Sequence, residues 1–167
     1  MSEIPAEAPA TRLFLRHALA TLAYRAAKTL RGTPASFGEF RASPESPRVV
    51  DLVAHMGDLI EALARRLEGE SRWAVAVPQA WEPEVARFFA ALKRADDVLA
   101  SGAPIQGDPG QLFQGVLADA ITHTGQLAML RRLAGFKMKG EAYMRADIRI
   151  GVVGMEQTPP DPKFEFD

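Results

Sequence analysis

Apolar residues recur every three or four positions in four segments of the chain, which is the spacing of one face of an α-helix. The segments run roughly over residues 11–31, 47–68, 83–100 and 109–134. The apolar stripe of each is, in chain order, Leu15, Leu19, Leu22, Ala26 and Leu30; Leu52, Met56, Leu59, Leu63 and Leu67; Val85, Phe88, Phe89, Leu92, Val98 and Leu99; and Leu112, Val116, Leu127, Leu130 and Leu133. The pattern predicts four amphipathic helices of about 20 residues each.

Two of the expected helices have clear starting signals. Ser46 is a good N-cap and Pro47 a good first helical residue for the second helix, and Asp108 and Pro109 play the same parts for the fourth. A glycine follows each of the four segments, namely Gly32, Gly69, Gly102 and Gly135. The connections before the second and third helices are long for a simple up-and-down arrangement.

The sequence therefore predicts an all-α protein, a four-helix bundle with long inter-helix connections. We expect a single domain over residues 1–167, with its core at about 11–135 and a C-terminal extension at 136–167. The extension is rich in glycine and proline, which favours a short helix near Glu141–Ile148 followed by an irregular tail.

Polar side chains interrupt the apolar stripes of the second and fourth helices. His55 lies three residues after Leu52, and His123 lies seven after Val116, so both are expected on inward faces. Asp119 is one helical turn before His123, and Gln126 extends the same patch. Buried polar groups are costly unless they are paired, so this patch needs a partner.

A divalent metal is one partner that would satisfy the patch. Two ligands one turn apart, Asp119 and His123, together with His55 from a facing helix, form a three-ligand face with open positions for water or substrate. Gln126 or Asp58 would then orient the ligands from behind. Two other interpretations of the patch stay open, a metal-free hydrogen-bond network and an apolar cavity that binds a ligand. Asp58 has an alternative of its own, a position on a solvated edge of the helix.

Composition narrows the function classes. Lys and Arg number 20 against 21 Asp and Glu, so nucleic acid is not expected as a partner, because phosphate binding needs a basic excess. The absence of cysteine excludes disulfides, thiolate metal sites and a cysteine nucleophile in this sequence. The first residues lack a signal-peptide pattern and no apolar run is long enough to span a membrane, so we expect a cytoplasmic protein.

Two motifs resemble the DinB/YfiT-like superfamily. They are SPRVVDLVAHMGDL, which contains His55, and ITHTGQLAMLRRLAG, which contains His123. The segments GEAYMRADI and GVVGMEQ in the extension resemble an uncharacterised DinB-like branch. The resemblance covers roughly residues 11–135, and the extension carries it close to the end of the sequence.

The resemblance implies a four-helix bundle, commonly dimeric, with a divalent metal held by one histidine of the second helix and two of the fourth. His55 and His123 match two of these ligands, and Asp119 stands where the family has its remaining histidine. Two histidines and a carboxylate suit iron, manganese or nickel as well as zinc. The resemblance also implies a homodimer acting on a small molecule, by hydrolysis or by group transfer with a low-molecular-weight thiol. A non-catalytic dimer that binds a ligand or a partner is the alternative.

Overall fold

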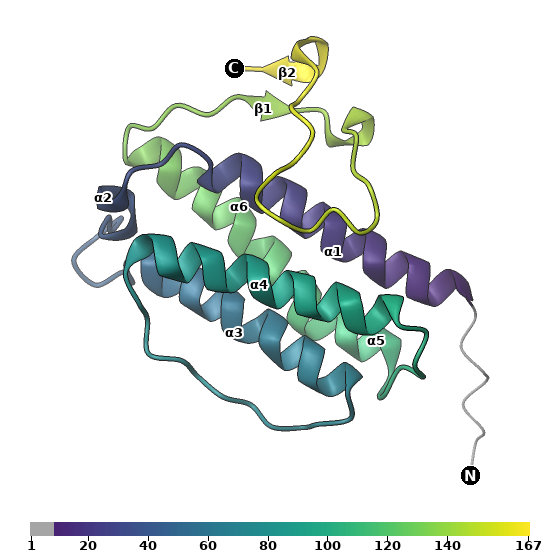
Figure 1. Ribbon diagram of the computed structural model, residues 1–167. Coiled ribbons are helices and arrows are strands. Elements are labelled where there is room, and N and C mark those ends of the chain that lie inside the picture. Colours follow the sequence, from purple (N-terminus) through teal and green to yellow (C-terminus); the bar gives the residue numbers. More distant parts are fainter. Residues whose placement is uncertain (1–8) are drawn as a thin grey trace.

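The computed structural model describes residues 9–167 as a mostly helical protein in which the long helices run roughly alongside one another (Figure 1). The helices are α1 (Pro9–Leu30), α2 (Ala35–Gly38), α3 (Val49–Leu67), α4 (Trp81–Ala100), α5 (Pro109–Leu112), a π-helical turn (Phe113–Leu117) and α6 (Ala118–Leu133). Helices α3 and α4 contact each other, and α1 and α6 each contact both neighbours in a closed ring α1–α4–α3–α6. No helix among the described residues has the length and apolarity needed to cross a membrane.

The predicted apolar stripes form the core of the molecule. Every stripe residue of α1 and α3 is buried, as are Phe88, Phe89, Leu92 and Leu99 of α4. One continuous hydrophobic cluster joins these side chains to those of α6. Burying leucine-rich faces against one another stabilises each helix far more than its local propensity does.

The start of α3 differs from the prediction. Its N-cap is Arg48, and Ser46 and Pro47 lie before the helix. The Ser46 hydroxyl donates to the carbonyl of Ser43 within a tight turn, so it does not cap a helix. Asp51 accepts hydrogen bonds from the backbone N–H and the guanidinium of Arg48 instead, and thereby closes the first turn of α3.

The fourth helical segment is interrupted by a π-helical turn. It begins as predicted at Asp108, whose carboxylate accepts a hydrogen bond from the N–H of Gln111 at 2.8 Å. The turn Phe113–Leu117 then spaces the buried Leu112 and Leu117 five residues apart. The buried line continues from Leu117 through Ala120, Thr124 and Leu127. Leu127 was on the predicted stripe, whereas Leu117, Ala120 and Thr124 each lie one position after a residue that was expected to face inward. Leu133, expected on the stripe, is exposed.

The long connections are anchored by a few side chains. The connection after α1 contains α2, whose Phe37 is fully buried and packs edge-to-face on Trp81 and Phe136. The connection from 68 to 80 is extended, and it leaves Val75 and Val77 exposed. Helix α2 was not predicted, because a single turn is too short to show a helical period in the sequence.

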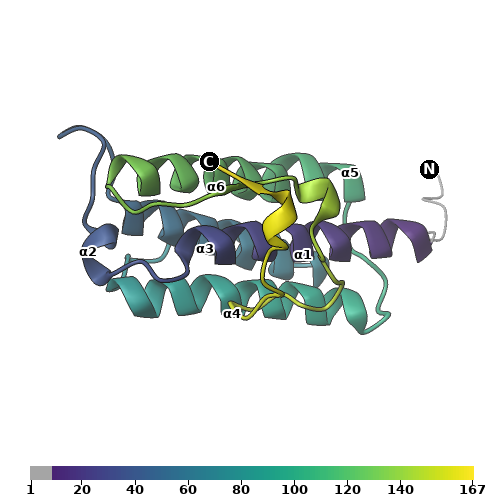
Figure 2. The same ribbon diagram turned by 90° about the horizontal axis from the view of Figure 1, so that it is seen from above.

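The C-terminal extension folds back across α1, as Figure 2 shows from above. The short helix expected near Glu141–Ile148 is reduced to one 3₁₀ turn at Tyr143–Arg145. Residues Gly140–Glu141 form strand β1, which pairs antiparallel with β2 (Glu165–Phe166), and only single 3₁₀ turns lie between them, at Tyr143–Arg145 and Pro162–Phe164. Buried contacts override the local helical pattern here, because the Glu141 carboxylate accepts hydrogen bonds from Tyr24 and Lys28 of α1.

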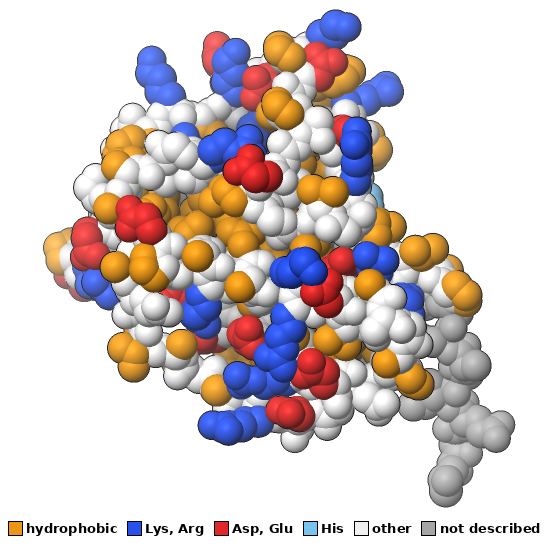
Figure 3. Space-filling model, in the orientation of Figure 1, with side chains coloured by type: hydrophobic (Ala, Val, Ile, Leu, Met, Phe, Trp, Pro, Cys, Tyr) orange, Lys and Arg blue, Asp and Glu red, His pale blue; other side chains and the backbone are white. Residues whose placement is uncertain are grey.

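Charged side chains of both signs are interspersed over the face drawn in Figure 3. Many form ion pairs between elements, as Arg16 does with Asp96 across α1 and α4. Pairs that are open to water, such as Arg94 with Glu68, are screened and contribute little on their own.

Candidate metal centre

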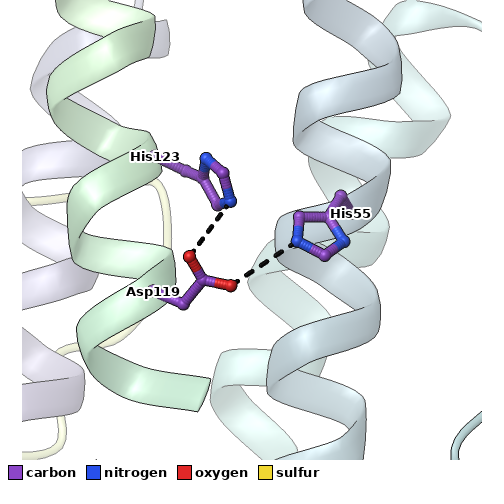
Figure 4. A group of neighbouring side chains, drawn as sticks. All are labelled: His55, Asp119 and His123. Atoms are coloured by element: carbon purple, nitrogen blue, oxygen red, sulfur yellow. Dashed lines mark ion pairs between the residues drawn. The ribbon is translucent and has the colours of Figure 1, made fainter. Parts of the chain in front are cut away.

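Helices α3 and α6 bring together the three residues predicted as metal ligands. His55 projects from α3, and Asp119 and His123 project from α6 one turn apart, all toward one another (Figure 4). The Nε2 atom of His55 lies 3.7 Å from Oδ2 of Asp119, and Nε2 of His123 lies 3.3 Å from Oδ1 of Asp119. The two imidazole rings have their centroids 5.0 Å apart.

These separations fit a divalent cation. One donor atom from each of the three residues lies within 4.8 Å of the other two. Donors bound about 2.0–2.2 Å from one tetrahedral zinc ion lie about 3.3–3.6 Å from one another. A small rotation of the side chains would therefore complete the triangle, and both imidazole nitrogen and carboxylate oxygen are ordinary ligands for zinc, nickel, manganese and iron.

Gln126, expected to orient a ligand, contacts His123. Its Oε1 lies 2.7 Å from Nδ1 of His123, one turn along α6. In the tautomer with the proton on Nδ1, the amide oxygen accepts a hydrogen bond from that nitrogen, and Nε2 presents a lone pair toward Asp119. A lone pair and a carboxylate oxygen repel each other at this distance, and a cation between them removes the repulsion.

The sequence predicted a buried centre, but the centre lies at the edge of the core and is partly exposed. The side chains of His55, Asp119 and His123 are 42%, 46% and 17% exposed, and Gln126 is exposed. The π-helical turn accounts for the difference on α6, because its extra residue moves positions 119, 123 and 126 from the core line to the α3 side of α6. The centre is thus accessible from solvent.

An open groove of about 530 Å³ adjoins the centre on the side of the π-helical turn. Asp119 forms part of its wall, together with Leu59 of α3 and Gly115, Val116 and Thr122. Apart from the neighbouring backbone of its own helix, no atom of the described residues lies within 4 Å of the position that a Cβ atom of Gly115 would take. The groove is therefore open at Gly115. The groove gives a small molecule room beside the ligand atoms.

Asp58, the other residue expected to orient a ligand, belongs to a different cluster. Its Oδ1 accepts a hydrogen bond from Arg87 at 2.9 Å and its Oδ2 accepts one from the backbone N–H of Ala76 at 3.2 Å. It is also buried, so it is no solvated helix edge. Both earlier interpretations of Asp58 are therefore wrong, and its role is to hold α3, α4 and the connection between them together.

Sequence reasoning missed the partners of Asp58. Arg87 also pairs with Glu84, which is fully buried, and its Nη2 donates to the carbonyl of Ala54 at 2.7 Å. The close approach needs Gly57, since a Cβ atom there would lie 2.9 Å from that nitrogen. The only sequence signal was Gly57 within a helical pattern, beside an acidic residue.

Comparisons with protein-family models, with curated proteins and with solved structures found no match to this chain.

Proposed function

We propose that this chain is a four-helix bundle of the DinB-like type that holds a divalent metal ion at His55, Asp119 and His123. Its helices support this proposal because α1, α4, α3 and α6 contact one another in a closed ring. The observation that carries the metal site is the convergence of three ligand atoms from two facing helices, with one side open to solvent. The proposal includes a cytoplasmic homodimer.

We propose further that the centre serves an enzyme acting on a small molecule, either by hydrolysis or by group transfer involving a low-molecular-weight thiol. A divalent ion at such a face supplies Lewis acidity to a water or thiol at its open positions. The Asp119 carboxylate offsets part of the cationic charge, and Gln126 fixes the orientation of His123. Leu59 and Val116 give the adjoining groove an apolar wall.

The test is metal content measured by plasma mass spectrometry on metal-free protein that has been reloaded separately with zinc, nickel, manganese and iron. We expect one equivalent per chain for the wild-type protein and loss of stoichiometric metal in His123→Ala. The matched control is His17→Ala, which removes an exposed histidine of α1 far from the centre in the sequence. Retention of stoichiometric metal by His123→Ala would sink the site assignment.

A second variant separates a defective site from an altered one. Asp119→His restores the three-histidine set that the family resemblance implies, and we expect it to bind zinc more tightly than the wild-type protein relative to manganese, because imidazole is a softer ligand than carboxylate. The loaded protein is then assayed for hydrolysis of a p-nitrophenyl ester and for coupling of a small thiol to chlorodinitrobenzene. Metal binding without turnover of either kind would leave a binding protein, not an enzyme.

The non-catalytic alternative rests on one observation, namely that Asp119 already lies within 3.7 Å of both imidazoles. A protonated imidazole on either side would pair directly with the carboxylate and hold α3 to α6 without a metal. In that case a chelator leaves the melting temperature unchanged, whereas removal of a bound metal lowers it.

A further inference from the structure

A second hollow lies on the other side of α6, under the C-terminal extension. It measures about 240 Å³ and is bounded by α1, α6 and the chain around β1 and β2. Its walls are largely apolar, with Ile121, Met138, Tyr143 and Phe166 among them. Gly140 lets this wall close, because a Cβ atom there would lie 2.3 Å from the ring of Phe166. The fold-back of the extension therefore builds a pocket that the helices alone lack.

Two guanidinium groups, those of Arg25 and Arg132, line this pocket. Arg25 stacks on the ring of Tyr143, with its Cζ 4.0 Å from the ring centroid. Arg132 donates to the carbonyl of Ala128, one turn earlier in its own helix. The ion pairs formed within residues 9–167 include neither arginine. Glu141 also lines the pocket, but its carboxylate pairs with Lys28, so no carboxylate of the described residues forms an ion pair with these two arginines.

The nearest acidic side chains are already engaged. Both oxygens of Glu141 accept hydrogen bonds, one from Tyr24 and one from Lys28, and Glu165 also pairs with Lys28. Burial and the Glu141 carboxylate raise the pKa of Tyr24, so its hydroxyl stays a donor to that carboxylate. Lys28 is therefore balanced one turn from Arg25, and Arg25 is not.

The Nε atom of Arg25 is buried and donates to no acceptor among the described residues. A buried donor without an acceptor is costly, and a charged one more so. A carboxylate or a phosphate offers paired oxygens that match the guanidinium fork. An acid group at Arg25 and Arg132 would balance the charge of the two guanidinium groups, and an apolar body would cover Ile121, Met138 and Phe166.

We propose that this pocket binds a small organic anion, namely a carboxylate or phosphate monoester joined to an apolar body about the size of one ring. The volume supports this class, because a cavity of about 150 Å³ holds benzene and the pocket is about 240 Å³. The acid group lies between Arg25 and Arg132, and the apolar body lies along the walls from α6 and the extension. The site is separate from the metal centre and does not depend on it.

The test is a nuclear magnetic resonance titration of the isotope-labelled full chain with benzoate, phenyl phosphate, inorganic phosphate and neutral benzamide. We expect benzoate and phenyl phosphate to shift the amide signals of Gly125 and Gly140 saturably. Inorganic phosphate lacks the apolar body and benzamide lacks the charge, so each should bind about tenfold more weakly or worse. Equal affinity for benzamide, or no saturable shift with benzoate and phenyl phosphate, would overturn the proposal.

Variants locate the site. Arg25→Gln and Arg132→Gln should each weaken benzoate binding about tenfold or more, the loss expected for a hydrogen bond to a charged group. The matched control is Arg72→Gln, which removes an exposed charge from the connection before α4 and should change nothing. Arg132 is exposed, so its replacement leaves the fold intact even if Arg25→Gln loosens the extension. Unchanged affinity in both pocket variants contradicts the site, and unchanged affinity in His123→Ala keeps it distinct from the metal centre.

Discussion

Helix α3 contributes one residue to each of two polar clusters, Asp58 to one and His55 to the other, and the clusters differ in what faces their carboxylates. Toward α4, Asp58 and Glu84 are buried and share the guanidinium of Arg87, which lies over Gly57. Toward α6, Asp119 faces His55 and His123 and is about half exposed. One cluster has a permanent positive charge at its centre, and the other has two imidazoles that are neutral when unprotonated.

This difference separates a structural cluster from a candidate ligand site. A guanidinium stays charged at every physiological pH, so Arg87 balances one of its two carboxylate partners. All four oxygens of Asp58 and Glu84 also accept hydrogen bonds, from Arg87 and from the backbone N–H groups of Ala76 and Gln79, so none of them is free to bind another cation. Neutral imidazoles leave the negative charge of Asp119 uncompensated, and they add lone pairs of their own. An acidic residue beside histidines on an open face is therefore better evidence of a metal site than an acidic residue buried beside arginine.

The largest expected effect is on the α4 side. Arg87→Met leaves Asp58 and Glu84 buried without their cation, so we expect the free energy of unfolding to fall by about 3–5 kcal/mol, measured by urea denaturation. Arg94→Met is the matched control two turns along α4, where the pairs with Glu61 and Glu68 are more exposed and a loss of about 1 kcal/mol or less is expected. Equal losses in the two variants would show that the Arg87 cluster is no more critical than a surface pair.

Exchanging one carboxylate for an amide in each cluster tests the comparison directly. Asp119→Asn should weaken metal binding by about 100-fold and change the stability of the metal-free protein by about 0.5 kcal/mol or less. Asp58→Asn should do the reverse, with unchanged metal affinity and a stability loss of about 1–3 kcal/mol. Calorimetric metal titration and denaturation of both variants check this prediction. A loss of metal affinity in Asp58→Asn would contradict it, because it would show that the two clusters are not independent.

A smaller effect is expected at Gln126. Gln126→Leu removes the hydrogen bond to Nδ1 of His123, so metal affinity should fall about 10-fold or more while the ligands stay in place. Gln126→Glu keeps an oxygen acceptor and should retain most of the affinity. The control is Gln79→Leu at an exposed position before α4. If Gln126→Leu binds metal like the wild-type protein, the orientation of His123 depends on packing alone.

The smallest effect is expected at Asp51, in the first turn of α3. Hydrogen bonding to the Arg48 side chain holds the pKa of the Asp51 carboxyl below its ordinary value of 3.8. A lowered folded-state pKa adds stability above the unfolded value, and that stability is lost as the pH falls through the folded value. Asp51→Asn should therefore cost about 1 kcal/mol at pH 7, and the difference from wild type should vanish as the pH falls from about 4 to about 2. A stability difference that does not change with pH would show that the ionised carboxylate of Asp51 does not stabilise the start of α3.

Helix periodicity predicted the four long helices and placed Asp119 and His123 one turn apart, because these features depend on local spacing. The position of His55 opposite them depends on the packing of α3 against α6, which the spacing alone does not determine. The π-helical turn could not be predicted, since it changes the phase of α6 only through packing of Leu112 and Leu117 against the core. Its consequence was an error in burial at the centre and at Leu133. The hydrogen bonds of Glu141 and Arg87 could not be predicted either, because their partners lie far away in the sequence.

The π-helical turn also constrains how this sequence can change. Deleting a single residue between Phe113 and Leu117 would restore ordinary α-helical winding and rotate the following residues by about 100° relative to Leu112. The sequence downstream would be unaltered, yet Asp119 and His123 could no longer face His55 while Leu112 stayed in the core. Loss of one codon that encodes none of the three candidate ligands would thus separate them as surely as replacing one of them, and an alignment scored by identity alone would hardly register it.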